Sequence, residues 1–191
     1  PALTFESFFN HTLMHEISHG VGPGVIEVDG RKSEVKKELK ETYSKIEECK
    51  ADVLGMTNNI LLLDRGVYPE DYERQIWVTF LANIFRSTRF GIGEAHGASN
   101  AIILNYVLEQ GGYVYDQTTQ TVGVDFSKIR QAMQQLAADI LRIEAAGDYQ
   151  AALKMIEIYA VDSPPLVQLR SKLQSIPVDI TPAFQIEKTG I

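Results

Sequence analysis

The 191-residue sequence lacks any apolar run approaching the roughly 18 residues that a membrane-spanning helix needs. The longest candidate, residues 58–63, ends at Asp64 and Arg65. We therefore expect no membrane partner. The sequence also has a single cysteine, Cys49, which excludes a disulfide within the chain. A lone thiol is typical of proteins in reducing compartments, so a cytoplasmic location is favoured.

An excess of positive charge is absent as well. The chain has 18 basic and 25 acidic side chains and a net charge of -7, which repels the phosphates of nucleic acids. Nucleic acid is therefore not an expected partner. With 45% hydrophobic and 23% charged residues, the composition is that of a globular protein rather than a disordered one. The sequence starts Pro-Ala-Leu-Thr, without a methionine or a signal segment, so we expect a fragment of a longer chain.

Apolar residues recur at three- and four-residue spacing through most of the sequence, which predicts helices. The expected helices cover residues 3–19, about 33–63, 69 to the glycines at 91 and 93, 94–110, 125–146 and 149–159, and a short one opens at 163–165. Residues 113–116 and 121–124 predict a short hairpin, and the tail from Pro177 is expected to be irregular. The predicted fold class is mainly α: one helical unit over residues 1–191 with a small β-hairpin.

The first predicted helix carries a pattern that points to metal chemistry. His15-Glu16-Ile17-Ser18-His19 is an HExxH sequence, and residues four apart lie on one face of a helix. Both imidazoles can then reach one divalent ion, for which zinc is the expected metal at one ion per chain. Glu16 can hold a water molecule beside that ion and take its proton.

A catalytic zinc ion needs a third protein ligand, and the second predicted helix offers carboxylates for it. Glu48 and Asp52 are four residues apart, so both can face the first helix. Glu48 is the candidate metal ligand, and Asp52 can accept the free N–H of a liganding histidine. Glu47 is a second candidate for that support. The cluster is flanked by residues of buried type, Cys49 among them, so acidic groups here indicate a bound cation.

These two motifs, HEISHG and EECKAD, together resemble the signature pair of the dipeptidyl peptidase III family, zinc exopeptidases that release dipeptides from the amino terminus of oligopeptides. Further stretches extend the resemblance over essentially the whole chain, in the family's order: GEAHGASNAIILNYVLEQGG, VDFSKIRQAM, AGDYQAALKMIEIYA and VDSPPLVQLRSKL. The resemblance implies a helical zinc-bearing catalytic lobe of a two-lobed enzyme.

The resemblance also implies roles for single residues. His15, His19 and Glu48 correspond to the zinc ligands and Glu16 to the general base. Glu47 and Asp52 correspond to partners of the two histidines, and His96 to a histidine that stabilises the oxyanion formed during hydrolysis. The expected partners are an oligopeptide substrate and the parent chain's missing N-terminal lobe, which in this family holds the substrate's free amino terminus.

Two positions depart from the family pattern. The family most often has one residue more between its two histidine ligands, whereas the five-residue spacing here is regular for an unbroken helix. Asn100 stands four residues after His96, where the family pattern leads us to expect an arginine. This difference puts one charged contact to the substrate in question.

Other interpretations stay open at this point. The chain could be another peptidase with HExxH plus a glutamate, such as an aminopeptidase, or a non-catalytic zinc-binding or regulatory module. His11 is interpreted as a surface or supporting histidine, since a fourth protein ligand would close the position that catalysis needs. Arg86 and Arg89 near the end of the third helix complement its dipole, and binding a substrate carboxylate is their functional alternative.

Overall fold

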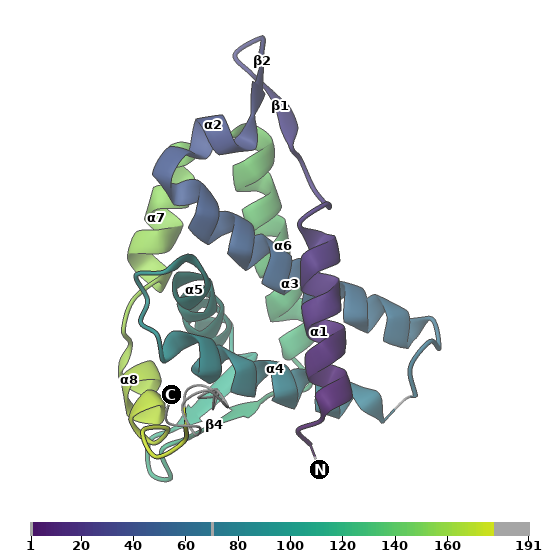
Figure 1. Ribbon diagram of the computed structural model, residues 1–191, viewed down its shortest axis with the longest axis vertical. Coiled ribbons are helices and arrows are strands. Elements are labelled where there is room, and N and C mark those ends of the chain that lie inside the picture. The colour runs from purple at the N-terminus through teal and green to yellow at the C-terminus, as the bar shows by residue number, and fades with distance from the viewer. Residues whose placement is uncertain (1, 70, 178–191) are drawn as a thin grey trace, which may run out of the picture.

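The computed structural model describes residues 2–69 and 71–177. Figure 1 shows a bundle of helices with two small hairpins. The elements are α1 (Phe5–Ser18), β1 (Val25–Val28), β2 (Arg31–Glu34), α2 (Val35–Leu39), the 3-10 turn η1 (Lys40–Thr42), α3 (Tyr43–Asp64), α4 (Tyr72–Thr88), α5 (Ala95–Glu109), β3 (Tyr113–Asp116), β4 (Thr121–Val124), α6 (Ile129–Ala146), α7 (Tyr149–Tyr159) and α8 (Pro164–Ser171). The predicted mainly α fold class is confirmed.

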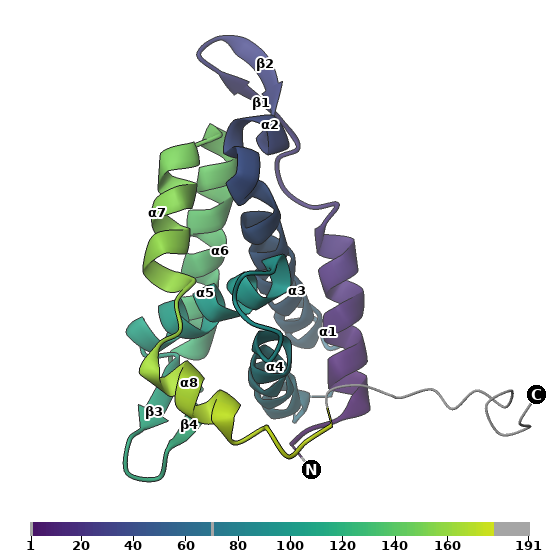
Figure 2. The same ribbon diagram turned by 60° about the vertical axis from the view of Figure 1, so that its left-hand side comes forward.

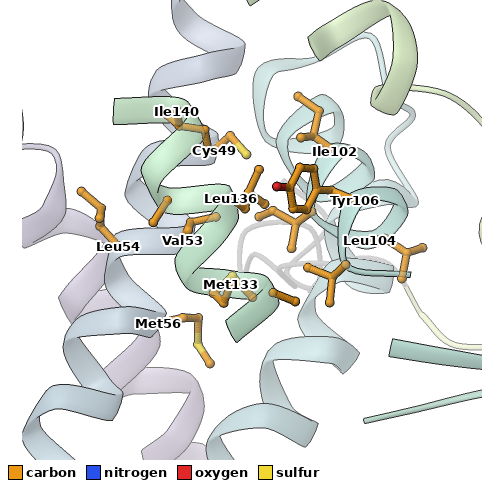
Figure 3. Packing of buried hydrophobic residues seen from close by; sticks show 14 of the residues in the cluster. Cys49, Val53, Leu54, Met56, Ile102, Leu104, Tyr106, Met133, Leu136 and Ile140 are labelled. Carbon is orange, nitrogen blue, oxygen red and sulfur yellow. The ribbon is translucent and has the colours of Figure 1, made fainter. Parts of the chain in front are cut away.

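Helix α3 forms the centre of the structure. It packs against α1 on one side and against α5 and α6 on the other (Figures 1 and 2). Helix α5 is buried from Gly97 to Leu104, and α4 and α7 cover it. A helix that is apolar on all sides suits such an interior position. Figure 3 shows part of the resulting core, in which α3, α5 and α6 contribute Cys49, Val53, Met56, Ile102, Tyr106, Met133, Leu136 and Ile140.

Helix α1 is turned with its polar face inward. Its buried residues are Ser7, His11, His15 and Ser18, spaced at four, four and three. The apolar positions that reveal the helix in the sequence face solvent instead, with Phe5 78%, Phe9 52% and Ile17 50% exposed. The core of the described structure therefore does not cover the apolar side of α1.

The helix predicted over about 33–63 is wrong in its first third. Residues Arg31–Glu34 form β2, which pairs with β1, and the helix is interrupted at Lys40, whose φ is 53°. The turn between the strands is Asp29-Gly30, with φ values of 50° and 74°. Two residues with positive φ make the hairpin turn for which Asp-Gly is a preferred sequence. The Asp-Gly turn sequence is present, but the helical periodicity that follows it led to the prediction of a helix in place of the hairpin.

The remaining elements lie close to their predicted bounds. The predicted hairpin matches β3 and β4, and α7 begins and ends as expected. Helix α6 starts at Ile129 rather than at Asp125, because Asp125 instead makes a turn in which its carboxylate accepts the amide of Ser127. The irregular tail predicted after Pro177 lies outside the described residues. Among the described helices, none combines the length and the apolar character that crossing a membrane requires.

Candidate metal centre

The close crossing of α1 and α3 creates the candidate site. Gly55 of α3 lies directly beneath α1, and a Cβ atom there would sit 2.9 Å from the backbone nitrogen of His15. Only a residue without a side chain allows two helix backbones to come this near. Because of this contact, His15 and His19 of α1 lie beside the carboxylates of Asp52 and Glu47, one to two turns before Gly55 on α3.

Three donor atoms converge at this crossing. His15 Nε2 lies 3.2 Å from His19 Nε2 and 3.3 Å from Glu48 Oε2, and His19 Nε2 lies 3.7 Å from the same oxygen. Donor atoms bound at about 2.0–2.1 Å to a tetrahedral zinc ion stand about 3.3 Å apart. Glu48 Oε2 is buried and accepts no hydrogen bond from the described residues. The three side chains therefore fit a single small cation.

The opposite edge of each imidazole is held by a carboxylate. The His15 Nδ1 to Asp52 Oδ1 distance is 2.8 Å, and the His19 Nδ1 to Glu47 Oε1 distance is 2.9 Å. A neutral histidine that donates from Nδ1 has a lone pair on Nε2. Two such lone pairs and a carboxylate oxygen facing one another repel unless a proton or a metal cation lies between them.

The electrostatics of the site favour positive charge. Burial opposes the imidazolium form of His15, but the hydrogen bond with Asp52 and the nearby carboxylate of Glu48 outweigh it and raise the pKa of His15 to about 10. Burial alone would raise the pKa of the Glu48 and Asp52 carboxyls. The facing histidines nevertheless hold the pKa of Glu48 and of Asp52 below its usual range. The crossing therefore keeps two ionised carboxylates beside the imidazoles, the environment that a divalent cation stabilises.

Helix α5 fixes Asp52 from the other side. Ser99 Oγ and the Asn100 side-chain amide donate to Asp52 Oδ2 at 3.0 and 3.3 Å. Asn100 is only 2% exposed and also donates to the backbone carbonyl of His96. It thus supports the candidate metal site through Asp52, and although it lines the same cavity, its neutral amide lacks the charge that an arginine would bring. His11 is also buried, with Nε2 3.5 Å from Asp52 Oδ1, so it is not a surface histidine.

A second buried network supports His19. Lys50 Nζ lies 2.9 Å from Glu47 Oε1 and 3.9 Å from Glu144 Oε2 of α6. Lys50 is 3% exposed and Glu144 is fully buried. Sequence reasoning missed this network, because Glu144 lies almost a hundred residues from its partners and no local pattern marks it.

Glu16 and His96 lie at the open side of the crossing. Both line a cavity of about 460 Å³ between α1, α4 and the start of α5, together with His15. His96 Nδ1 lies 3.2 Å from Glu48 Oε2, and its side chain is 65% exposed. The structure thus brings all seven predicted site residues to one place, with Glu16 and His96 on the side that is open to solvent.

No protein-family model matches the chain. Among curated proteins, Nudix hydrolase 3 of Arabidopsis thaliana is 40% identical over 185 residues, which is 95% of this chain and 24% of that protein. Since most of the Arabidopsis protein lies outside the alignment, its name does not say what the matched part does.

Two solved structures are similar over almost the whole chain. Dipeptidyl peptidase III from Caldithrix abyssi has 61% sequence identity and a TM-score of 0.95 over 99% of this chain. Dipeptidyl peptidase III from Corallococcus sp. strain EGB has 35% identity and a TM-score of 0.92 over 98% of it. This chain spans 36% and 35% of those two chains, about a third of their length. In sequence and in fold, the chain is similar to dipeptidyl peptidase III, and the resemblance to that family is confirmed.

Proposed function

We propose that the chain is the zinc-bearing catalytic part of a metallopeptidase that releases dipeptides from the amino terminus of oligopeptides. The observation that carries this proposal is the meeting of His15 Nε2, His19 Nε2 and Glu48 Oε2 while carboxylates hold both Nδ1 atoms. Nitrogen and carboxylate donors in this number suit zinc with one position left open, as catalytic zinc sites require. The two similar dipeptidyl peptidase III structures support the same activity.

The proposed reaction is peptide-bond hydrolysis. A zinc ion held by His15, His19 and Glu48 would supply Lewis acidity toward the peptide carbonyl and ease deprotonation of water. Glu16, which lines the cavity beside His15, takes the proton of the attacking water and passes it to the leaving amine. His96, exposed at the same opening, donates a hydrogen bond to the developing oxyanion.

We propose further that the rest of a longer chain completes the enzyme. The solved relatives are about three times as long as the matched segment. The apolar side of α1, here called the α1 stripe, consists of Phe5, Phe9, Leu13, Ile17 and the following Val21, all 41–78% exposed. A row of large apolar side chains at four-residue spacing is typical of a helix face that another element covers. The occupant we propose is the missing lobe, which also holds the substrate's amino terminus.

A cytoplasmic location is part of the proposal. The thiol of Cys49 is buried and unpaired, and burial raises its pKa well above the ordinary value. Such a thiol is stable in a reducing compartment and needs no oxidising one.

Replacing Glu16 with Gln tests the function. In the longer protein, Glu16→Gln should keep about one zinc per chain by elemental analysis, because the carboxylate is not a ligand. Hydrolysis of a dipeptidyl arylamide should fall by a factor of about 10²–10⁴ or more, because general-base catalysis is lost. Glu6→Gln, an exposed change in the first turn of the same helix, is the matched control and should keep full activity.

His19→Ala completes the experiment, since it should lose most of the metal. A Glu16→Gln variant as active as the wild type would contradict the catalytic proposal and favour a zinc-binding module. Release of single residues rather than dipeptides would favour an aminopeptidase of related chemistry.

A further inference from the structure

Helix α4 contributes a wall of the cavity that the metal motifs do not account for. Asn83, Arg86 and Ser87 line the cavity from one face of α4, and Phe90, just after the end of the helix, lines it as well. The face of α1 that carries Glu16 lines the same cavity. A substrate held against Glu16 therefore lies along this face of α4.

Arg86 is an available cation in that wall. Its side chain is exposed, and among residues 2–69 and 71–177 it has neither an ion-pair nor a hydrogen-bond partner within contact distance. Its guanidinium carbon lies 5.7 Å from the centre of the Phe8 ring, a cation–π contact across the cavity from α4 to α1. By contrast, Arg130 and Arg170 are paired with Asp64 and Asp162. Arg86 is thus oriented by an aromatic ring while its donors stay free.

The other polar groups of the wall suit a peptide. Asn83 Oδ1 is buried without a hydrogen-bond partner among the described residues, one turn of α4 before Arg86. A backbone N–H of a bound peptide can supply the missing donor. The cavity volume of about 460 Å³ lies in the range of about 300–1,000 Å³ that holds small ligands, which corresponds to a few residues.

We propose that Arg86 binds the C-terminal carboxylate of short peptide substrates, on the leaving-group side of the bond that is cut. This inference rests on the proposed function. A peptide carries an ammonium group at one end and a carboxylate at the other, and a free guanidinium attracts only the second. Because cleavage occurs two residues from the amino terminus, the carboxylate of a short peptide lies within a few residues of Glu16, inside the reach of this cavity.

Two acidic residues share the cavity and bear on the charge argument. Glu16 is the proposed base, and Glu94 lies before the first turn of α5. Neither is within 4 Å of the Arg86 guanidinium, so neither neutralises it. If Glu94 instead attracted the substrate's ammonium group into this cavity, the preference for a free carboxylate would be absent.

The experiment compares two tetrapeptides of one sequence, one with a free C-terminal carboxylate and one with a C-terminal amide, in the longer zinc-loaded protein. The wild type should have the lower KM for the free acid. Arg86→Gln should raise KM for the acid about 3- to 10-fold and abolish the preference for it, as expected for one charge-assisted hydrogen bond near solvent. Arg86→Lys should keep part of the preference, because it keeps the charge without the planar fork.

Arg89→Gln is the matched control. Arg89 lies one turn further along, does not line this cavity and donates to the backbone carbonyl of Ile176, so the control should keep the acid preference. A wild type that does not distinguish acid from amide, or an Arg86→Gln variant that keeps the preference, would overturn the proposal. An equal loss in Arg89→Gln would show a general charge effect and overturn it too. Absence of arylamide hydrolysis by the wild type would instead mean that the proposed function has failed.

Discussion

Among single residues, Glu144 shows how far the candidate metal site extends into the interior. It lies on α6 with no exposed surface, and neither of its carboxylate oxygens has a hydrogen-bond partner among the described residues. Lys50 Nζ, 3.9 Å away, is shared with Glu47, the carboxylate that holds His19. Burial is the largest effect on Glu144 and raises its pKa to about 8, and the neighbouring Glu47 acts in the same direction against the attraction of Lys50.

This pKa makes the stability of the protein depend on pH. Glu144 is protonated in the folded state up to about pH 8 but ionises near 4.5 once unfolded. Unfolding between these values releases a proton, so Glu144 makes the free energy of unfolding fall as pH rises, by at most about 1.4 kcal/mol per pH unit, and this contribution levels off above pH 8. Glu144→Gln should remove this contribution, so its slope between pH 5.5 and pH 8 should be shallower than that of the wild type. Urea unfolding in a chelator at about pH 5.5, 7 and 8.5 measures it.

Glu157→Gln, an exposed change on α7, is the control for general charge effects and should follow the wild type. If the difference between Glu144→Gln and the wild type stayed constant across the three pH values, the protonation argument for Glu144 would be wrong.

The residues of the site differ in whether a local sequence pattern identifies them. His15, Glu16 and His19 could be predicted because one turn of helix fixes their relation, and Glu48 and Asp52 because the same rule applies on α3. The roles of these residues remain predictions. Lys50 with Glu144, and Asn83, could not be found, because their positions relative to the site depend on how α4 and α6 pack. Arg86 was a candidate for binding a substrate carboxylate, but its place in the cavity wall depends on the same packing.

At the scale of elements, the α1–α3 crossing determines the geometry of the site. Gly55→Ala should place a methyl group 2.9 Å from the His15 nitrogen and 3.2 Å from its Cα, so α1 must move away from α3. Overpacking of this kind costs about 1–3 kcal/mol of unfolding free energy. It should also separate His15 from Glu48 and weaken zinc affinity by about 10- to 100-fold, as loss of ligand support does. Chelator competition and thermal unfolding measure the two effects.

Gly24→Ala is the comparison for Gly55→Ala, because a Cβ at Gly24 would have no atom within 4 Å. It should change neither zinc affinity nor stability by much. Equal zinc affinity in the two variants would show that the close crossing does not position the ligands.

Helices could be predicted from the sequence wherever the helical spacing of apolar residues continued without a break between two residues or pairs that end a helix. Helix α7 lies between Gly147-Asp148 and Tyr159, and Asp148 caps it by accepting the amide of Ala151. The failure at β2 has a physical cause. Glu34, Lys37 and their neighbours have helical charge spacing, but Ser33 is buried in the hairpin and Lys40 has a positive φ that no sequence rule requires.

At the scale of the whole molecule, the exposed α1 stripe predicts a missing contact. In the longer protein, Phe9→Glu should lower the free energy of unfolding by about 2–4 kcal/mol, because a buried aromatic ring is replaced by a charge. The zinc content should be unchanged, since Phe9 points away from His15. Val114→Glu, an exposed position on β3, is the control and should have little effect. A Phe9→Glu protein as stable as the wild type would mean that nothing covers the stripe.

The fold class followed from the sequence because most segments show helical periodicity and only short ones do not. Whether the apolar side of a given helix faces the core or the solvent could not be predicted from the sequence. Periodicity identifies an apolar face of α1, but only the packing shows that the polar face, with His11 and His15, is the one directed at the described core.

Helix α1 consequently carries two separate sets of evolutionary constraints. If His15 and His19 bind the proposed ion, substitutions on their side are limited by the chemistry of that ion and its carboxylate partners, which allows almost no exchange of residue type. Substitutions along Phe5, Phe9, Leu13 and Ile17 are limited by the shape of whatever covers them, so they can drift in size when the covering surface changes with them. The two faces of one helix should therefore diverge at different rates, with paired changes confined to the outer one.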